Sequence, residues 1–557
     1  MNCLVEVCCS VIRVLRSFND AGPGRVILVW LLSALSVSVA EKPNIIFIMA
    51  DDLGYSDLGC YGGEIQTPVL DSLAQEGLRY SQFYNTGRCW ISRTALMTGY
   101  YPQQHAARGA APSYSRIIPH YVKPNGYRAY HSGKWHVTPG FNQTVGKGLF
   151  DRSYYTVGQD RFHTPKQAKL DDNAFVPDTA DGNYYETIAQ VDYALGFLDE
   201  HEQTHSEKPF FLYLAFIAPH FPLHALPEDI AKYKDTYTVG WDEIREARWE
   251  RIQQMGLVDG ELPERMIDFR NAWGMTAEQL KERIDPRETL ENKLWVDLTP
   301  AEQVFQAEKM AVHAAMIDRM DQEIGRLVQW LKDNGKYENT LIMFASDNGA
   351  SSEFINRGDK HRMGSVPGSK ESYLCLGPGW AWTANTPMRY SKAYTFEGGI
   401  ATPFIAHWPA GIEDKNAIRT TPAHLVDILP TVVQLSGGLN AELIPPEAPR
   451  FPGRDLTDSF VSDAPVDRDL LIFSHIGDAL RVGDWKLVRL PKGEWELYKM
   501  DGDRAETNNV AADYPEKLQQ MSQLFSKTSG DYRAKALAET PKAKKTSQKD
   551  KNKKAKK

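Results

Sequence analysis

The run Asn44-Ile45-Ile46-Phe47-Ile48-Met49-Ala50 is almost entirely apolar and has the length of a strand, and it stops abruptly at Asp51 and Asp52. An apolar run without alternation is typical of a strand buried on both faces of a parallel sheet. Three further runs of this kind occur along the chain, at 127–131, 210–218 and 340–345. The pattern predicts a central sheet made mostly of parallel strands.

Polar side chains follow the other three runs as well. The chain reads Gly133-Lys134-Trp135-His136 after the first, Pro219-His220 at the end of the second and Ser346-Asp347-Asn348-Gly349 after the third. In open α/β sheets, ligands bind outside the carboxyl ends of the strands. We therefore expect the four polar clusters to share one edge of the sheet.

Helical periodicity lies between the apolar runs. Apolar residues repeat on one face over 310–331, and Gly335 follows as a C-terminal cap directly before the run at 340–345. Shorter helices are predicted at 71–77 and 184–198. Because helix and strand alternate, the predicted fold class is α/β, with a large central, mostly parallel sheet flanked by helices.

Composition also divides the chain into parts. The segment 227–300 is polar, rich in Glu and Arg, and lacks a strand signal, which predicts a helical insertion within an α/β domain over 41–440. Short strand patterns separated by turns predict a small antiparallel-sheet subdomain over 441–533. Residues 534–557 are rich in Lys and poor in large apolar side chains, which predicts a disordered tail.

The composition is that of a globular protein with a large core. The 557 residues are 42% hydrophobic and 24% charged, with a formal net charge of −8. Because the Lys-rich tail contributes positive charge to this total, the rest of the chain has a more negative net charge than −8. Nucleic acid is therefore not an expected partner. The apolar segment 26–40 ends in Ser38-Val39-Ala40 and predicts a signal peptide with an extended leader over 1–40. We expect export to the periplasm or secretion, with no stable membrane span.

Six cysteines occur, and those that remain after the predicted signal segment are Cys60, Cys89 and Cys375. Three cysteines cannot form a disulfide framework. The sequence therefore predicts a core-stabilised protein, with at most one bridge between Cys60 and Cys375.

Residues 89–99 read Cys-Trp-Ile-Ser-Arg-Thr-Ala-Leu-Met-Thr-Gly. This predicts a short apolar helix with Cys89 at its start and Arg93 one turn inside. The free N–H groups of a helix start attract anions, and an arginine can grip two oxygens of a tetrahedral anion. Taken alone, however, a cysteine is typical of an inert core thiol. The functional interpretation therefore depends on the other residues.

The stretch resembles the activation motif of type I sulfatases, which belong to the alkaline-phosphatase-like superfamily. In that motif a cysteine, here Cys89, is oxidised to formylglycine, and Leu-x-Thr-Gly follows the arginine. Ile91 departs from the motif, which has Pro or Ala at the third position. The resemblance covers roughly residues 43–510. It implies an arylsulfatase-like sulfuric ester hydrolase acting on sulfate esters, with a formylglycine-generating enzyme as its maturation partner. The predicted export and the sizeable insertion suit sulfated oligosaccharides as substrates.

Asp51, Asp52, Asp347 and Asn348 offer only hard oxygen ligands, which favour calcium or magnesium over zinc. The resemblance implies that these two pairs hold one divalent cation beside the formylglycine made from Cys89. Calcium is the usual ion of the family, and Mg²⁺ is less favoured. The alternative for the first pair is that both aspartates cap a turn after the strand. Two such pairs at the ends of two core strands favour the metal site.

The family also surrounds its metal with cationic groups, because sulfate oxygens must be neutralised before attack at sulfur. The resemblance implies that Arg93 and Lys134 stabilise the aldehyde hydrate and the bound oxygens. It implies that His136 assists proton removal as the sulfated intermediate collapses. His220 would donate a proton to the leaving alcohol, and Lys392 would bridge the sulfate and the leaving oxygen.

Two other functions stay open. A phosphatase or phosphodiesterase of the same superfamily would share the fold, although such enzymes commonly use two zinc ions with several His ligands. A catalytically silent protein that binds sulfated glycans is suggested by Ile91, since a bulky β-branched side chain there would slow conversion of Cys89. Four tryptophans near the motifs either stack on a sugar or aryl ring or serve as packing residues: Trp90, Trp135, Trp380 and Trp382.

Overall fold

Strand β1 (Asn44–Ala50) lies at the centre of an eleven-stranded sheet, between parallel β7 (Phe210–Ala215) and parallel β8 (Thr340–Ser346). All seven of its residues are buried, and neighbouring side chains enter different cores, Ile46 on one face and Phe47 on the other. Double burial of this kind requires an apolar side chain at every position rather than at every second one. The apolar run therefore encodes the central position of β1.

The computed structural model describes residues 41–105, 111–137, 148–158, 162–179, 182–267, 275–355 and 360–540. The predicted signal peptide over 1–40 and the end of the predicted tail, 541–557, lie outside them. The chain that the structure describes from Lys42 onward is one compact unit. None of its described helices is long and apolar enough to span a bilayer.

The large sheet is mixed, with a parallel centre. Its order is β10-β2-β9-β8-β1-β7-β3-β4-β5-β6, and β11 also pairs with β2. The pairs from β8 through β1, β7 and β3 to β4 are parallel, whereas β9 is antiparallel to both β8 and β2. The remaining bounds are β2 (Leu78–Tyr84), β3 (Arg128–Gly133), β4 (Arg152–Thr156), β5 (Ala168–Leu170), β6 (Asn173–Phe175), β9 (Ala401–His407), β10 (Ala417–Arg419) and β11 (Ala423–His424). The prediction of a large, mostly parallel sheet is confirmed.

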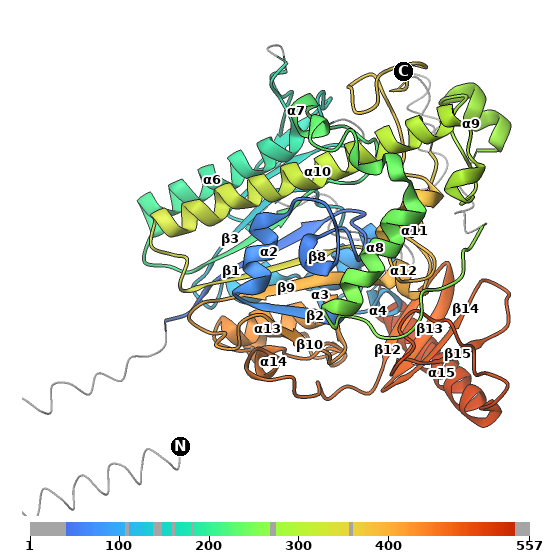
Figure 1. Ribbon diagram of the computed structural model, residues 1–557. Helices are drawn as coiled ribbons and strands as arrows, with labels where there is room; N and C mark the ends of the chain where they lie inside the picture. The colour runs from blue at the N-terminus through green and yellow to red at the C-terminus, as the bar shows by residue number, and fades with distance from the viewer. Residues whose placement is uncertain are drawn as a thin grey trace, which may run out of the picture. The chain divides into compact units, whose positions relative to one another are not determined.

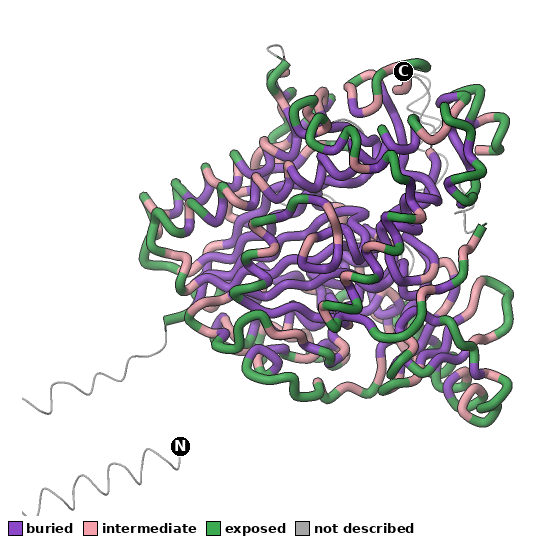
Figure 2. The backbone as a smooth tube through the Cα atoms, viewed as in Figure 1, coloured by how far each residue is buried: buried purple, intermediate pink, exposed green. Residues whose placement is uncertain are grey.

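Helices cover both faces of this sheet (Figure 1). On one side lie α6 (Glu186–His205) and α10 (Pro300–Asp333), which pack against each other. On the other side α5 (Ile118–Val122) and α13 (Ile428–Leu435) share a core with alternate residues of β1. Figure 2 shows the strands as a nearly continuous buried layer between these helices.

The helices differ from their predicted bounds: α10 extends past 310–331 at both ends, α2 (Pro68–Gln75) starts and ends before 71–77, and α6 starts and ends after 184–198. Helix α10 begins at Pro300, after Thr299 and Glu302 form a capping box, and α2 begins at a proline in its first turn. Strand β7 ends at Ala215 rather than Ala218, and the Phe216 amide that follows still bonds to the Met49 carbonyl of β1.

The segment 227–300 contains the helices α7 (Pro227–Ala231), α8 (Trp241–Gln254) and α9 (Ala277–Arg283). Its described residues contain no strand. Helix α8 packs against α11 (Pro378–Ala384) near the carboxyl edge of the sheet.

A separate four-stranded antiparallel sheet follows, as predicted. It consists of β12 (Leu471–His475), β13 (Gly477–Val482), β14 (Trp485–Arg489) and β15 (Glu496–Lys499). Between residue 441 and this sheet the chain still packs on the large sheet, where Arg419 Nε donates to the Ser459 carbonyl across 2.6 Å.

Helix α15 (Pro515–Glu539) follows the small sheet and includes the first residues of the segment expected to be a disordered tail. That expectation is corrected for residues 534–539, whose single large apolar side chain, Leu537, is exposed but which extend a helix that is anchored earlier. Its anchors are Met521 and the contact of Phe525 with Trp495.

The three described cysteines, Cys60, Cys89 and Cys375, are all free thiols and all buried. The structure therefore contains no bridge between Cys60 and Cys375, which the sequence had left open. Apolar burial rather than covalent crosslinking stabilises the described fold.

Candidate functional site

The first part of the site comes from the carboxyl end of β1. Asp51 is fully buried and Asp52 almost so, and Asp52 adopts φ 65°, in the left-handed region that aspartate tolerates better than most residues. Because β1 is the central strand, its end places these two carboxylates in the middle of the sheet edge. If Asp51 and Asp52 served only to cap the turn after β1, their two carboxylates would not both need to be buried.

The second part is helix α3 (Cys89–Thr98). Cys89 is its first residue, and Arg88 before it makes no side-chain cap, so the backbone N–H groups of the first turn are not capped by that side chain. Ser92 accepts the Thr86 amide across 3.0 Å, which fixes the chain that enters the helix. Gly99 ends the helix with φ 69°, a conformation that glycine adopts without strain.

Arg93 connects this helix to three strand ends. Its Nε donates to Asp347 Oδ2 across 2.7 Å, its Nη1 donates to the Lys134 carbonyl across 3.1 Å, and its Nη2 lies 3.8 Å from Asp51 Oδ2. The side chains of Arg93, Asp51 and Asp347 have no exposed surface. One guanidinium therefore ties the helix that carries Cys89 to the carboxyl ends of β1, β3 and β8.

Two lysines pair with the carboxylates at the end of β1. Lys134 donates to Asp51, and Lys392 lies 2.6 Å from Asp52 Oδ1. Asn348 Nδ2 donates to the same Asp52 oxygen across 2.7 Å. Each carboxylate thus has a cationic partner that comes from a distant part of the chain.

The charges in this cluster shift its pKa values strongly. Although burial acts to raise the pKa of Asp51, the charges of Lys134 and its other cationic neighbours hold that pKa well below its usual range. Burial, followed by the charge of Asp51, raises the pKa of Asp347 to about 7. Burial raises the pKa of the Cys89 thiol, so the unmodified side chain is a poor thiolate nucleophile.

The two histidines lie at the same edge. His220 Nδ1 bonds to the Phe221 carbonyl across 2.6 Å, which leaves Nε2 at 3.8 Å from Asp52 Oδ2. Burial lowers the pKa of His220 to about 4. Burial and the Lys134 charge lower the pKa of His136, which has φ 46°, to about 2. Both imidazoles are therefore neutral near pH 7 in this environment.

The oxygen atoms of the cluster fit a divalent cation. Asp51 Oδ1 and Asn348 Oδ1 are buried and have no hydrogen-bond partner among the described residues. An unpaired buried acceptor is costly unless a cation or water satisfies it. Ligand atoms of Asp51, Asp52 and His220 lie within 4.8 Å of one another. The sequence predicts oxygen ligands from Asp51, Asp52, Asp347 and Asn348, whereas the distances group Asp51 and Asp52 with His220. Both sets therefore contain Asp51 and Asp52. They differ in the ligands that complete the site, which are Asp347 and Asn348 in the first set and His220 in the second.

We favour the oxygen set, because calcium and magnesium prefer oxygen ligands and the two unpaired atoms are both oxygens. His220 Nε2 lies near enough to contact a group bound by Asp52 without being a ligand itself. The cluster is therefore suited to hold a hard cation next to the start of α3.

The structure thus brings together the ten residues that the sequence assigned to the catalytic and metal sites, and it adds three more. Glu353 is buried, with Oε2 at 3.7 Å from Lys392 Nζ and Oε1 at 3.7 Å from Arg88 Nη2. Arg88 Nη1 in turn lies 3.2 Å from Nε2 of His475, at the end of β12. Glu353 follows Asn348 closely enough that the polar run after β8 could have suggested it. No local signal marks His475.

Of the four tryptophans near the motifs, two are packing residues. Trp380 and Trp382 are buried, and Trp380 donates to the Gln306 carbonyl across 2.7 Å. Trp382 stacks on the guanidinium of Arg245. Trp135 is 5% exposed, and Trp90 is half-buried. Only these last two retain surface from which to contact a ligand.

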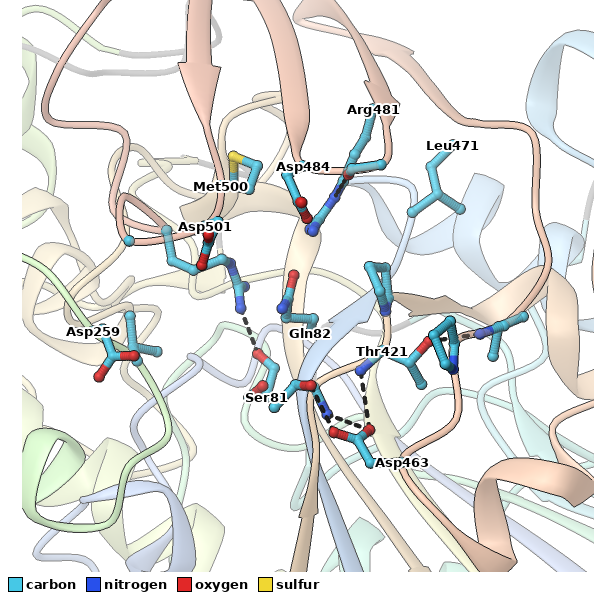
Figure 3. Close-up of a pocket in the computed structure, with 18 of the residues that line it drawn as sticks. Ser81, Gln82, Asp259, Thr421, Asp463, Leu471, Arg481, Asp484, Met500 and Asp501 are labelled. Atoms are coloured by element: carbon cyan, nitrogen blue, oxygen red, sulfur yellow. Dashed lines mark hydrogen bonds between the residues drawn. The ribbon is translucent and has the colours of Figure 1, made fainter.

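A cavity of about 610 Å³ lies between strand β2 and the C-terminal sheet (Figure 3). Its lining contains none of the site residues above. Two of its arginines are already engaged, Arg504 with Glu397 and Arg468 with Asp427. A second cavity, of about 410 Å³, includes Lys134 and His136 in its lining and so adjoins the site.

Comparison with known proteins gives a consistent result. A protein-family model described as Sulfatase matches residues 43–438. An uncharacterized sulfatase of Schizosaccharomyces pombe is 30% identical over 544 residues, which cover 87% of this chain and 93% of that protein. An arylsulfatase of Klebsiella aerogenes is 32% identical over 438 residues, with coverages of 71% and 87%. The crystal structure of Ps i-CgsB in complex with k-i-k-neocarrahexaose has a TM-score of 0.63 at 23% identity, and covers 88% of this chain and 94% of that one.

Proposed function

Because this chain belongs to the sulfatase family and is an arylsulfatase-like hydrolase of sulfate esters, we propose that it acts through a formylglycine made from Cys89 and through a bound calcium ion. The observation that carries the proposal is the position of Cys89. It begins a helix that Arg93 ties to Asp51 and Asp347, beside two buried acceptor atoms without partners. A thiol of raised pKa would serve poorly there, whereas an oxygen nucleophile made from it would not.

The cation and the formylglycine would supply two kinds of chemistry. When bound, a divalent cation contributes positive charge against the sulfate oxygens. The hydrated aldehyde supplies one hydroxyl for attack at sulfur and a second whose deprotonation releases the sulfate. Asp51, Asp52, Asp347 and Asn348 would hold the cation, because they present its preferred oxygen ligands at one point.

The remaining residues bind the sulfate and move protons. Lys134 pairs with Asp51 and Lys392 with Asp52, and both lysines would neutralise the sulfate oxygens. His220 directs Nε2 toward Asp52, and its Nδ1 contact with the Phe221 carbonyl fixes the ring. Because that contact uses the Nδ1 proton, Nε2 would protonate the leaving oxygen from the imidazolium form. The negative charge of a bound sulfate ester would raise the pKa of His220 toward that form. His136 would accept the proton of the second hydroxyl, a role that suits an imidazole held neutral by burial.

We extend the proposal to sulfated carbohydrates as substrates. Its support is the fold shared with a protein crystallised with k-i-k-neocarrahexaose, together with a cavity beside the site that is large enough for a sugar unit. Export of the protein, which segment 26–40 indicates, also stays a proposal.

Two measurements on one preparation test the function. The chain is produced with a formylglycine-generating enzyme, and the mass of the peptide that contains residue 89 is determined. We expect the aldehyde, together with calcium-dependent turnover of para-nitrophenyl sulfate far above that of para-nitrophenyl phosphate. Cys89→Ala is the matched control and should be inactive. An unmodified thiol throughout, without turnover, would overturn the mechanism and favour a glycan-binding protein, and a preference for phosphate with zinc would favour the phosphatase alternative.

A further inference from the structure

The cavity of about 410 Å³ lies where strand β3 ends and the β4–β5 hairpin begins to cover it. Lys134, Trp135 and His136 line it from the end of β3. Tyr155 and Lys169 line it from the hairpin, where they are direct cross-strand partners. The cavity thus begins at two residues of the sulfate site and extends away from them along the hairpin.

The charges of this cavity all have one sign. Its described lining residues include Lys134 and Lys169 and no carboxylate. Lys134 is already committed to Asp51. Lys169 is half-buried, forms no ion pair with another described residue, and holds its Nζ 5.5 Å from the centroid of the Tyr155 ring. Its ammonium is therefore the charge that a ligand in the cavity would meet.

The other walls suit a ring with polar substituents. Trp135 and Tyr155 are largely buried aromatic residues that retain 5% and 9% exposure, and Val137 adds apolar surface. Gln167 offers an amide, and Thr156 offers a hydroxyl oxygen that can accept a hydrogen bond, since its proton is donated to Glu186. A sugar ring has an apolar face of C–H groups and a polar edge of hydroxyl groups. The aromatic residues can contact the face, and the polar residues beside them can hydrogen-bond to the hydroxyl groups.

We propose that this cavity is a subsite for a second acidic group of the substrate, with Lys169 as the residue that selects it. The proposal rests on the proposed function, since it takes the scissile sulfate to lie at Lys134 and His136. The preferred substrates would be sulfated sugars that carry a further carboxylate or sulfate on the scissile unit or on its neighbour. A substrate with a single anion would use the catalytic residues alone.

The test compares substrates with one and two anions. Wild type, Lys169→Ala and Lys169→Glu are assayed with para-nitrophenyl sulfate, with a monosulfated monosaccharide, with a disulfated monosaccharide and with a sulfated disaccharide that contains a uronate. Lys166→Ala is the matched control, because Lys166 lies on the same hairpin, is exposed and is not part of the cavity lining.

For Lys169→Ala we expect kcat/KM to fall about 10–100-fold on the two-anion substrates, mainly through KM, because a charge-assisted contact is lost. Activity on the one-anion substrates should stay within about twofold, and Lys169→Glu should discriminate more strongly. Whether the disulfated sugar or the uronate loses more identifies the acidic group. Raising the salt concentration should weaken the two-anion preference of wild type and not that of Lys169→Ala.

An equal loss on all substrates would assign Lys169 a structural role, and an unchanged preference would exclude the subsite. Failure of the proposed function is distinguished by binding. Calorimetry with Cys89→Ala measures affinity for the two-anion sugars without turnover. If wild type is inactive but the affinity for two-anion sugars depends on Lys169, the subsite is supported and the proposed catalytic function is overturned. If the affinity does not depend on Lys169, the subsite is overturned.

Discussion

Arg93 Nε donates to Asp347 Oδ2 across 2.7 Å, and neither side chain has any exposed surface. The pair joins the second turn of α3 to the end of β8, which are 254 residues apart in the sequence. A buried ion pair is retained only where both partners have further contacts. Here those contacts are the Lys134 carbonyl on one side and the Asp52 amide on the other.

Arg93→Ala should lower both stability and activity. It leaves Asp347 buried without its main cationic partner, which costs about 3–5 kcal/mol, and removes a group facing the nucleophile, which lowers kcat/KM by at least about 100-fold. Chemical denaturation and turnover of para-nitrophenyl sulfate measure the two effects. The double variant Arg93→Ala/Asp347→Ala should be less destabilised than the sum of the single variants. Additive losses would contradict the coupling.

Replacing Ile91 should raise the fraction of Cys89 that is converted. Ile91 is buried in the first turn of α3, at the position where the family motif has Pro or Ala. Ile91→Ala therefore increases the aldehyde fraction measured by mass spectrometry, at a stability cost of about 2–5 kcal/mol for the lost side chain. Ile91→Leu is the control, because it keeps the bulk and should leave conversion unchanged. Equal conversion in all three proteins would remove this explanation of Ile91.

Removal of the bound cation should reduce stability together with activity. Without it, the buried oxygens of Asp51 and Asn348 that lack partners stay unsatisfied. A calcium chelator should therefore lower Tm and turnover in parallel, and calcium at about 100 times its Kd should restore about 2.7 kcal/mol. Differential scanning calorimetry and activity follow the titration. Full activity after exhaustive chelation would count against a catalytic cation, and recovery with zinc alone would point to different ligands.

The free energy of unfolding should decrease as the pH rises from about 4.5 to 7, because Glu186 loses its proton in the folded state over this range. Burial raises the pKa of this carboxyl from 4.5 to about 7, even though Tyr184, Thr156 and Gln190 donate hydrogen bonds to it. The folded state then holds a proton that the unfolded state has released, so the contribution is complete below pH 4.5 and lost by about pH 7. The difference is about 3 kcal/mol.

Glu186→Gln, which cannot titrate, should flatten this part of the stability curve. Urea denaturation at pH 5 and pH 8 measures the free energy of unfolding of wild type and of the variant. The variant should gain stability relative to wild type at pH 8 more than at pH 5. A parallel shift at both pH values would show that Glu186 does not carry the pH dependence.

The C-terminal sheet should be needed to hold the loop that carries Lys392. Lys486 on β14 lies 2.8 Å from Glu397 and 2.7 Å from Glu506, all buried, and Glu397 directly precedes Gly398 in the short helix after that loop. Lys486→Met leaves two buried carboxylates facing each other and should cost about 3–5 kcal/mol.

Lys499→Met, an exposed change on the neighbouring strand, should stay within about 0.5 kcal/mol. Thermal unfolding compares the two variants. If Glu506→Gln partly restores the stability of Lys486→Met, charge repulsion is the cause. If it does not, packing of the lysine stem accounts for the loss.

The site could be assembled from sequence to the extent that local patterns encode it. The apolar run that ends at Asp51 and the similar run that ends at Asp347 are each recognisable within ten residues, because burial on two faces requires apolar side chains throughout. The rule that ligands bind at the carboxyl ends of parallel strands then brings the clusters together. His475 could not be found in this way, since its contact with Arg88 joins a separate sheet to α3.

Sequence by itself determined the four central parallel strands of the large sheet, the polar residues at their ends, and the cysteine at the start of a helix. These depend on periodicity, length and capping, which act over a few residues. Only the tertiary structure decided that Arg93 pairs with Asp347, that Lys392 pairs with Asp52, and that Lys169 borders a cavity beside Lys134. Each of these depends on which distant groups meet after burial, because a charged side chain finds its partner in space and carries no local signal of where that partner lies.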